Sequence, residues 1–258
     1  MFRRILIPTD FSTASEWVFD DAIRIAGSSN AELVILHVRR TWPSNPDELR
    51  FPADSSLYEY AEQQELDRLR DRVRRANATL ATSLIVRQAP DAGAEICRTA
   101  LSENVDLIVI ATHGRHHVSH LFVGSTTLTV LKDPPAPVMA IRYGIRRRAG
   151  MSRAVVPLHL QQTSHRALEL ASRVTREVHL VTVCDDEHQT AAETLQREVS
   201  ATVPNAKSVI IHGKDPAEEL IKYCAKNDAD AIFLNAAHEP SKRKIDIVRN
   251  SPVPVMLV

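Results

Sequence analysis

Glycine is scarce in this sequence, and the glycine-rich loops typical of some nucleotide-binding proteins are missing. Only 7 of the 258 residues are glycine, whereas an average protein has about 7%. Each glycine is therefore more informative than usual, and two of them, Gly114 and Gly124, bracket one short segment. The chain has neither a G-x-x-x-x-G-K-[ST] loop nor a G-x-G-x-x-G loop. The usual glycine-rich loops of kinase-like and dinucleotide chemistry are thus excluded.

Cysteine, net charge and long apolar runs are also lacking. Cys97, Cys184 and Cys224 are far apart and odd in number, which argues against a disulfide framework. The 32 basic and 32 acidic residues cancel, so the basic footprint of a nucleic-acid-binding protein is missing. No apolar run approaches the ~18 residues of a membrane span, and the run before Pro8 is too short for a signal peptide. We expect a soluble, cytoplasmic protein with reduced cysteines and without nucleic-acid or membrane partners.

The chain does contain a regular alternation of short apolar runs with helical patterns. Thr13 and Glu16 form a capping box that predicts the start of the first helix, and another helix is predicted after Asp91. Strands separated by helices are normally parallel, so the first half predicts an α/β domain. The apolar runs that predict its five strands lie at residues 5–7, 33–38, 84–86, 107–110 and 138–141.

The second half of the chain repeats this pattern. Asp215 followed by Pro216 predicts a helix start within the repeat. Repetition indicates two tandem copies, which we divide into domains 1–143 and 151–258. Each copy ends in an apolar strand that alone would be an exposed edge. Pairing these two edges would form an intramolecular pseudo-dimer. The blocks that recur in order lie at residues 153–157, 178–183, 230–234 and 251–256.

Several residues of the first copy are predicted to meet at one edge of its sheet. Open parallel sheets bind ligands beyond the carboxyl ends of the strands, where the strand order reverses. Asp10 follows the first strand, and Gly124 and Ser125 open the helix after the fourth. A helix N-terminus suits phosphate because it offers free N–H groups and partial positive charge. The structural alternatives are that Gly114 is a turn residue, Ser125 an N-cap and Asp10 a cap of the first helix.

These residues resemble a known family. The stretch Ala111-Thr112-His113-Gly114, followed by nine residues and Gly124-Ser125, resembles the G-x2-G-x9-G-[ST] motif of nucleotide-binding universal stress proteins. The resemblance covers the whole chain as a tandem pair, strongly in the first copy and weakly in the second. It implies an open five-stranded parallel sheet of order 3-2-1-4-5 in each copy, Rossmann-like and of the adenine nucleotide alpha hydrolase type. It also implies a stress-response protein that binds ATP, with Mg²⁺, without a well-defined reaction.

The resemblance also implies which residues bind the nucleotide. Thr9 and Asp10 would face the ribose or adenine, and Val38 would contact the base. Ala111 departs from the motif, which has its first glycine there. Alanine costs little if this position has an ordinary negative φ and is strained if φ is positive. The other candidates are Pro8, Ala111, His113, Gly114, Gly124, Ser125 and Thr126, of which the last four would hold the phosphates and ribose.

The second copy lacks these features. Asp10 aligns with His159, and a shortened connection beginning at Ser241 replaces the Gly-Ser pair. Three basic residues, Lys242, Arg243 and Lys244, follow Ser241. Basic side chains attract phosphate as point charges, but the backbone loop that would cradle it is missing. We expect nucleotide to bind in the first copy only, with the second copy as its structural partner.

Two other functions stay open from the sequence. The histidine-rich segment 113–120 places His116 and His120 four residues apart, which on a helix is a spacing that can bind zinc. The chain could also be a nucleotide-independent interaction scaffold of the same fold, for an unknown protein partner or a second copy of itself. Catalysis has little support, because G-x-S-x-G is absent and Cys97 and Cys184 suit packing better than nucleophilic attack. We therefore expect a binding and signalling module that is not an enzyme.

Overall fold

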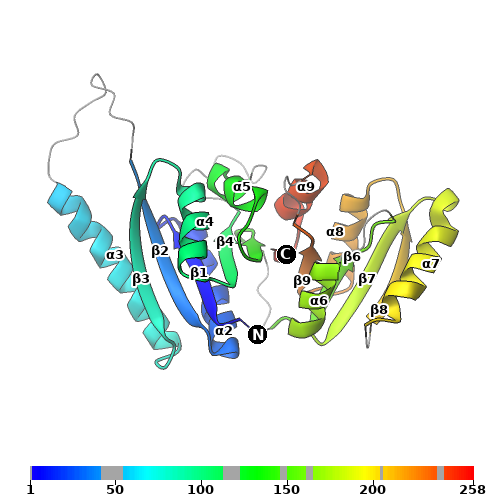
Figure 1. Ribbon diagram of the computed structural model, residues 1–258, viewed down its shortest axis with the longest axis horizontal. Helices are drawn as coiled ribbons and strands as arrows, with labels where there is room; N and C mark the ends of the chain where they lie inside the picture. Colours follow the sequence, from blue (N-terminus) through cyan, green and yellow to red (C-terminus); the bar gives the residue numbers. More distant parts are fainter. Residues whose placement is uncertain are drawn as a thin grey trace, which may run out of the picture.

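The computed structural model of the protein describes residues 2–41, 55–112, 123–145, 150–160, 165–203, 206–236 and 241–258. These residues form strands and helices in alternation (Figure 1). The strands of the first half are β1 Arg4–Thr9, β2 Glu32–Arg40, β3 Thr82–Ala89, β4 Leu107–Ala111 and β5 Val138–Ile141. Those of the second half are β6 Arg153–Pro157, β7 Glu177–Cys184, β8 Ala206–His212, β9 Ala231–Leu234 and β10 Val255–Leu257.

All of these strands join in one sheet, in the order β3-β2-β1-β4-β5-β10-β9-β6-β7-β8. Neighbours within each half are parallel. Each half therefore has the order 3-2-1-4-5, which confirms the predicted fold. The domain limits at residues 143 and 151 stay a prediction.

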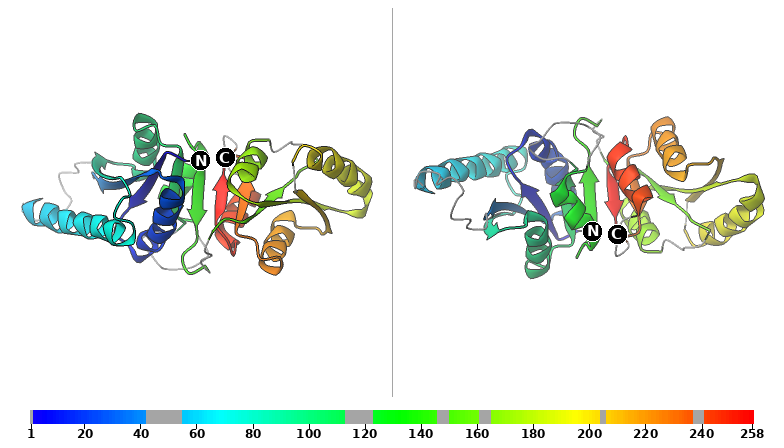
Figure 2. Two further views of the ribbon diagram at one scale, coloured as in Figure 1. Left: turned by 90° about the horizontal axis from the view of Figure 1, so that it is seen from below. Right: turned by 90° about the horizontal axis from the view of Figure 1, so that it is seen from above.

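The two halves meet where β5 pairs with β10, in antiparallel register. Figure 2 shows these two strands side by side at the centre of the molecule, pointing in opposite directions. Met139 lies opposite Met256, and both side chains are buried in the core on one face of the sheet. Val138 and Leu257, also opposite each other, are buried on the other face. This pairing confirms that the final strand of each copy covers the edge of the other.

Helices cover both faces of the sheet, and each face has a core that continues through both halves. One core lies beneath α1 Thr13–Trp17, α2 Phe19–Ser29, α3 Ser55–Ala76, α6 His165–Val174 and α7 Gln189–Ser200, with the 3₁₀ helix Asp186–His188 leading into α7. The other lies beneath α4 Ala92–Ser102, α5 Ser125–Lys132, α8 Pro216–Lys226 and α9 Lys242–Asn250. Seen from above, α5 and α9 lie on the same face of the central strands (Figure 2). No helix among the described residues is both long and apolar enough to span a bilayer.

The predicted helix starts are confirmed, but the cap residue predicted for the first helix is wrong. Asp91 caps α4 and Asp215 caps α8, each through a carboxylate oxygen that accepts from two backbone N–H groups. The cap of α1 is Ser12 rather than Thr13, because the Ser12 side chain accepts from the backbone N–H of Ser15. Thr13 is instead the first residue inside the helix and is exposed.

Candidate functional site

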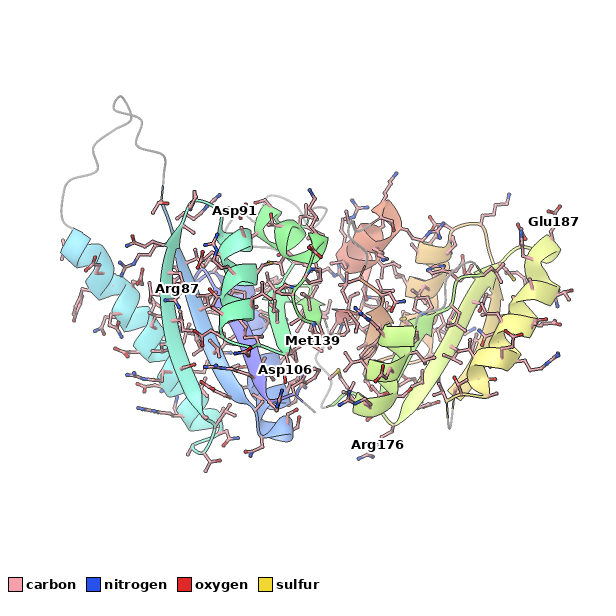
Figure 3. All side chains as sticks on the ribbon, viewed as in Figure 1. Arg87, Asp91, Asp106, Met139, Arg176 and Glu187 are labelled. Carbon is pink, nitrogen blue, oxygen red and sulfur yellow. The ribbon has the colours of Figure 1, made fainter. Side chains whose placement is uncertain are left out.

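The strand order of the first half reverses between β1 and β4. These strands are parallel neighbours, with Ile5 beside Leu107, and β2 and β5 lie outside them. Asp91, just after β3, and Asp106, just before β4, lie at opposite ends of the strands and mark the carboxyl and amino edges (Figure 3). The carboxyl ends of β1 and β4 therefore meet at the position where open α/β sheets bind their ligands.

The connection after β1 is a tight turn built from its own side chains. Asp10 Oδ1 accepts from the backbone N–H of Ser12 at 3.0 Å, and Thr9 Oγ1 accepts from the backbone N–H of Phe11 at 3.0 Å. The Thr9 hydroxyl also lies 3.3 Å from Ser15 Oγ. Because Thr9 is only 5% exposed, its hydroxyl serves the turn. Asp10 is half-buried beside it.

Phe11 adopts a left-handed backbone conformation, with φ of 60°. An L-residue in this region costs about 1–2 kcal/mol relative to the right-handed one, and a bulky residue rarely adopts it. The Phe11 ring stacks on His37 of β2, with ring centroids 4.4 Å apart. Strain of this kind persists only where several contacts hold it, and it is found more often at functional sites than elsewhere.

His37 lies beneath this turn and is a residue that the sequence analysis missed. It is 7% exposed, and its Nδ1 lies 2.8 Å from the backbone oxygen of Thr9. On its other side, Nε2 is 3.5 Å from the Glu62 carboxylate of α3. Arg39 donates to both oxygens of that carboxylate, at 2.7 and 2.8 Å. The sequence signal available was a polar residue inside the apolar run 33–38, which we interpreted only as a strand.

Val38, the predicted contact of the base, has the opposite orientation. Side chains alternate along a strand, so Val38 and His37 point to different faces of the sheet. Val38 is partly buried against the core beneath α4 and α5. The end of β2 thus supplies an apolar side chain on the face of α5 and a polar one on the face of α3.

The start of α5 is tied directly to the end of β4. The backbone N–H of Gly124 donates to the Thr112 oxygen at 2.8 Å, and Thr127 Oγ1 donates to the Ala111 oxygen at 2.8 Å. Gly124 is the N-cap of α5 and provides no side-chain cap. The backbone N–H groups of the first turn of a helix have no partner within the helix, so this end of α5 suits an anion.

The structure answers the question raised by Ala111. It lies in β4 and is not among the residues with positive φ, so alanine is unstrained there. Its methyl group is buried in the core beneath α1 to α3. The missing glycine therefore introduces no backbone strain at this end of β4.

The remaining candidates are placed as follows. Ser125 is exposed and Thr126 is half-buried in the first turn of α5, while Pro8 is buried beside Leu36 of β2. His113 and Gly114 lie outside the described residues, as do the other histidines of the segment 113–120. Among the described residues, no group of three or more histidine, cysteine or acidic side chains could hold a metal ion.

The equivalent edge of the second half is built differently. Ser241 caps α9 with its own hydroxyl, which accepts from the backbone N–H of Lys244 at 3.4 Å. Lys244 Nζ in turn donates to the backbone oxygen of Asn235 at 2.6 Å. A small hollow remains at this edge, and its lining includes Pro157, His159, Val181, Leu220, Arg243 and Ile247.

The charge of this edge also differs from that of the first half. Burial is the main cause that lowers the pKa of His159, and the nearby Arg243 and Lys244 lower it further. Burial also lowers the pKa of Lys244. The second half therefore has His159 where the first half has the carboxylate of Asp10, with the basic side chains of Arg243 and Lys244 of α9 nearby.

Comparison with known proteins gives a consistent family. The model of the universal stress protein family matches residues 1–142. A universal stress protein of Thermus aquaticus is 31% identical over 147 residues, covering 55% of this chain and 100% of the relative. Universal stress protein A homolog 1 of Coxiella burnetii is 29% identical over 147 residues, covering 54% of this chain and 96% of the relative.

Solved structures match the whole chain. A universal stress protein from Archaeoglobus fulgidus has a TM-score of 0.76 at 22% identity, with 98% of this chain and 95% of that chain covered. A functionally unknown protein from Pseudomonas aeruginosa has a TM-score of 0.64 at 13% identity, with 100% and 92% covered. At these identities the likeness shows the fold over both halves. Taken with the match over residues 1–142, the first-half sequence and the full-length architecture agree, and the chain belongs to the universal stress protein family.

Proposed function

We propose that the first half binds an adenine nucleotide, ATP, and that the protein acts as a regulatory module of the stress response rather than as an enzyme. The observation that carries this proposal is the glycine-capped N-terminus of α5, which is tied to the end of β4, while the turn of Asp10 follows the neighbouring strand β1. This arrangement supports the proposal because amides at a helix N-terminus suit an anion and a carboxylate at the end of the neighbouring strand can accept from sugar hydroxyls.

The residues present suit such a ligand. Gly124 has no side chain to fill the space in front of the first turn of α5. Ser125 and Thr126 add hydroxyl groups near the same amides. Val38 supplies an apolar side chain at the end of β2, as a base would require. ATP, with Mg²⁺, would bring its own metal, because the described residues supply no cluster for one.

The second half is proposed to be a structural partner that binds no nucleotide. Ser241 already satisfies a backbone N–H of α9, and Asp10 has His159 as its counterpart. A single site per chain follows from this difference. The match of the family model to the first half alone is in line with it.

Calorimetric titration with ATP and thermal melts with and without ATP test the proposal together. We expect one nucleotide per chain and a native state stabilised by about 2.7 kcal/mol when ATP is at 100 times its Kd. Gly124→Val should abolish both effects, because a branched side chain would stand before the α5 amides.

The matched control is Ser241→Val, which places the same side chain at the N-cap of the equivalent helix and should leave ATP binding unchanged. A nucleotide-independent scaffold of the same fold predicts instead that ATP shifts no melt at millimolar concentration. That result in the wild-type protein would refute ATP binding.

A further inference from the structure

We propose that His37 is a positioning residue that holds the Asp10 turn in the shape required for ligand binding. It does so without touching the ligand. The inference rests on the proposed function for the identity of the ligand, but the contact between His37 and the turn stands independently of it.

The first step concerns which atom of His37 acts. The backbone oxygen of Thr9 can only accept a hydrogen bond, and His37 Nδ1 lies 2.8 Å from it. Nδ1 therefore carries the proton in both the neutral and the charged imidazole. This hydrogen bond fixes the last residue of β1 immediately before Asp10.

The second step concerns the ring of His37. It stacks on Phe11 at 4.4 Å with 29° between the ring planes, so it supports the residue immediately after Asp10. Phe11 has a φ of 60°, which a bulky residue adopts only when its surroundings impose it. His37 thus contacts both neighbours of Asp10. It binds Thr9 through a hydrogen bond and Phe11 through ring stacking.

The third step concerns what holds His37. Its Nε2 faces Glu62 of α3 at 3.5 Å, and Arg39 of β2 fixes that carboxylate from the other side. Glu59, one turn earlier in α3, also lies 3.5 Å from Arg39. The imidazole therefore lies between α3 and the turn, with the Glu62 carboxylate on its Nε2 side.

At the equivalent strand position, the second half has no histidine to contact the turn. Pro8 pairs with Leu36, and its counterpart Pro157 pairs with Val181. The next residue along the second strand is His37 in the first half and Thr182 in the second, so Thr182 is the counterpart of His37. The Thr182 hydroxyl accepts from Gln196 of α7 at 2.8 Å and belongs to a helix contact. The contacts of an imidazole with the turn therefore occur in the half that contains Asp10 and that we propose to bind nucleotide.

Two substitutions separate the hydrogen bond from the ring. His37→Phe keeps an aromatic ring for Phe11 but has no donor for Thr9. His37→Asn keeps an N–H group at the position of Nδ1 but has no ring. Thr182→Val is the matched control at the equivalent position of the second half.

The first readout is amide hydrogen exchange of Phe11 and Ser12 in the ligand-free protein, followed by NMR. We expect His37→Phe to raise both exchange rates about tenfold or more, the scale of one lost hydrogen bond. His37→Asn should restore most of the protection, and amides of β4 should be unaffected in both variants. The imidazole ¹⁵N shifts of the wild type should report a protonated Nδ1.

The second readout is ATP affinity, which should fall about tenfold in His37→Phe, recover in His37→Asn and stay unchanged in Thr182→Val. Unchanged exchange of Phe11 and Ser12 in His37→Phe would overturn the inference. So would equal losses in both His37 variants, because the hydrogen bond to Thr9, which only His37→Asn keeps, would then make no difference. If the wild-type protein binds no ATP, the proposed function fails, and the exchange data still decide whether His37 holds the turn.

Discussion

The two halves of this chain share a sheet order but differ at the edge where ligands bind. In the first half, α5 begins at a glycine without a side-chain cap, and Asp10 forms a turn at the end of β1, the neighbour of β4. In the second half, Ser241 caps α9 and the half-buried His159 lies near Arg243. The difference teaches that the fold depends on buried strands, which both halves retain. A site depends on a few residues at the strand ends, which one half can lose without losing its architecture.

The largest effect is expected at the junction that both halves share. Met139→Ala and Met256→Ala should each lower the free energy of unfolding by about 2–5 kcal/mol, the usual cost of truncating a buried methionine. Both side chains are almost completely buried, opposite each other, so the two losses should be similar. Urea denaturation followed by circular dichroism measures them. A loss confined to one variant would show that the halves do not contribute equally to the junction.

A smaller effect is expected at the two helix caps. Ser241→Ala removes the hydroxyl that caps α9 and should cost about 1 kcal/mol. Gly124→Ser would add the corresponding cap to α5 and should stabilise the protein by a few tenths of a kcal/mol. We also expect this variant to bind ATP more weakly, because a hydroxyl would then compete for the α5 amides. Chemical denaturation tests the stabilities, and a destabilised Gly124→Ser variant would contradict an open α5 N-terminus.

A smaller difference between the halves is expected in how the free energy of unfolding depends on pH, because His159 belongs to the second half. The pKa of His159 is lowered from its ordinary value of 6.5, first by burial and then by Arg243 and Lys244. His159 therefore binds a proton more readily in the unfolded chain than in the folded one. The contribution of the neutral side chain to the free energy of unfolding is complete above pH 6.5 and is lost as the pH falls below it. The effect is modest because His159 is only partly buried, so water screens the charge.

His159→Asn provides the control for this pH effect. Denaturation at about pH 7.5 and about pH 5.5 brackets the ordinary histidine range. The wild-type protein should lose more stability between these values than the variant does. Equal losses would mean that His159 has no part in the pH response.

The smallest effect concerns thiol reactivity and should leave stability untouched. Cys97 of the first half is half-buried, and burial chiefly raises its pKa. Cys224 of the second half is fully buried, and burial raises its pKa to about 12. Since the thiolate is the reactive form, Cys97 should alkylate in the native protein and Cys224 only after unfolding. Mass spectrometry of iodoacetamide-treated protein checks this order, and early labelling of Cys224 would contradict it.

Much of the architecture could be predicted because it follows from local pattern. The apolar runs 33–38 and 107–110 indicated buried strands, and Asp91 and Asp215 marked helix starts through the chemistry of their carboxylates. The cap of the first helix was predicted one residue late, because Ser12 and Thr13 are both good caps and only the backbone conformation selects one of them. The pairing of the two terminal strands followed from their apolar sequence and unprotected edges.

The site was only partly predictable. The sequence identified Asp10, Gly124 and Ser125 as candidates at one edge of the sheet, and the strand order brings their strand ends to that edge. It gave no sign of Phe11 in a left-handed conformation. Nor did it indicate His37 as a support of the turn, since its contacts with Thr9 and Phe11 join segments far apart in the sequence.

By itself, the sequence determined the alternation of strands and helices, the duplication, and the loss of the glycine segment from the second copy. These features depend on periodicity and residue type, which act over a few neighbouring positions. Only the tertiary structure decided that Ala111 is unstrained and that His37 meets Thr9 and Phe11. Such contacts depend on the register between β1 and β2 and on the packing of α3, which join residues separated by long stretches of chain.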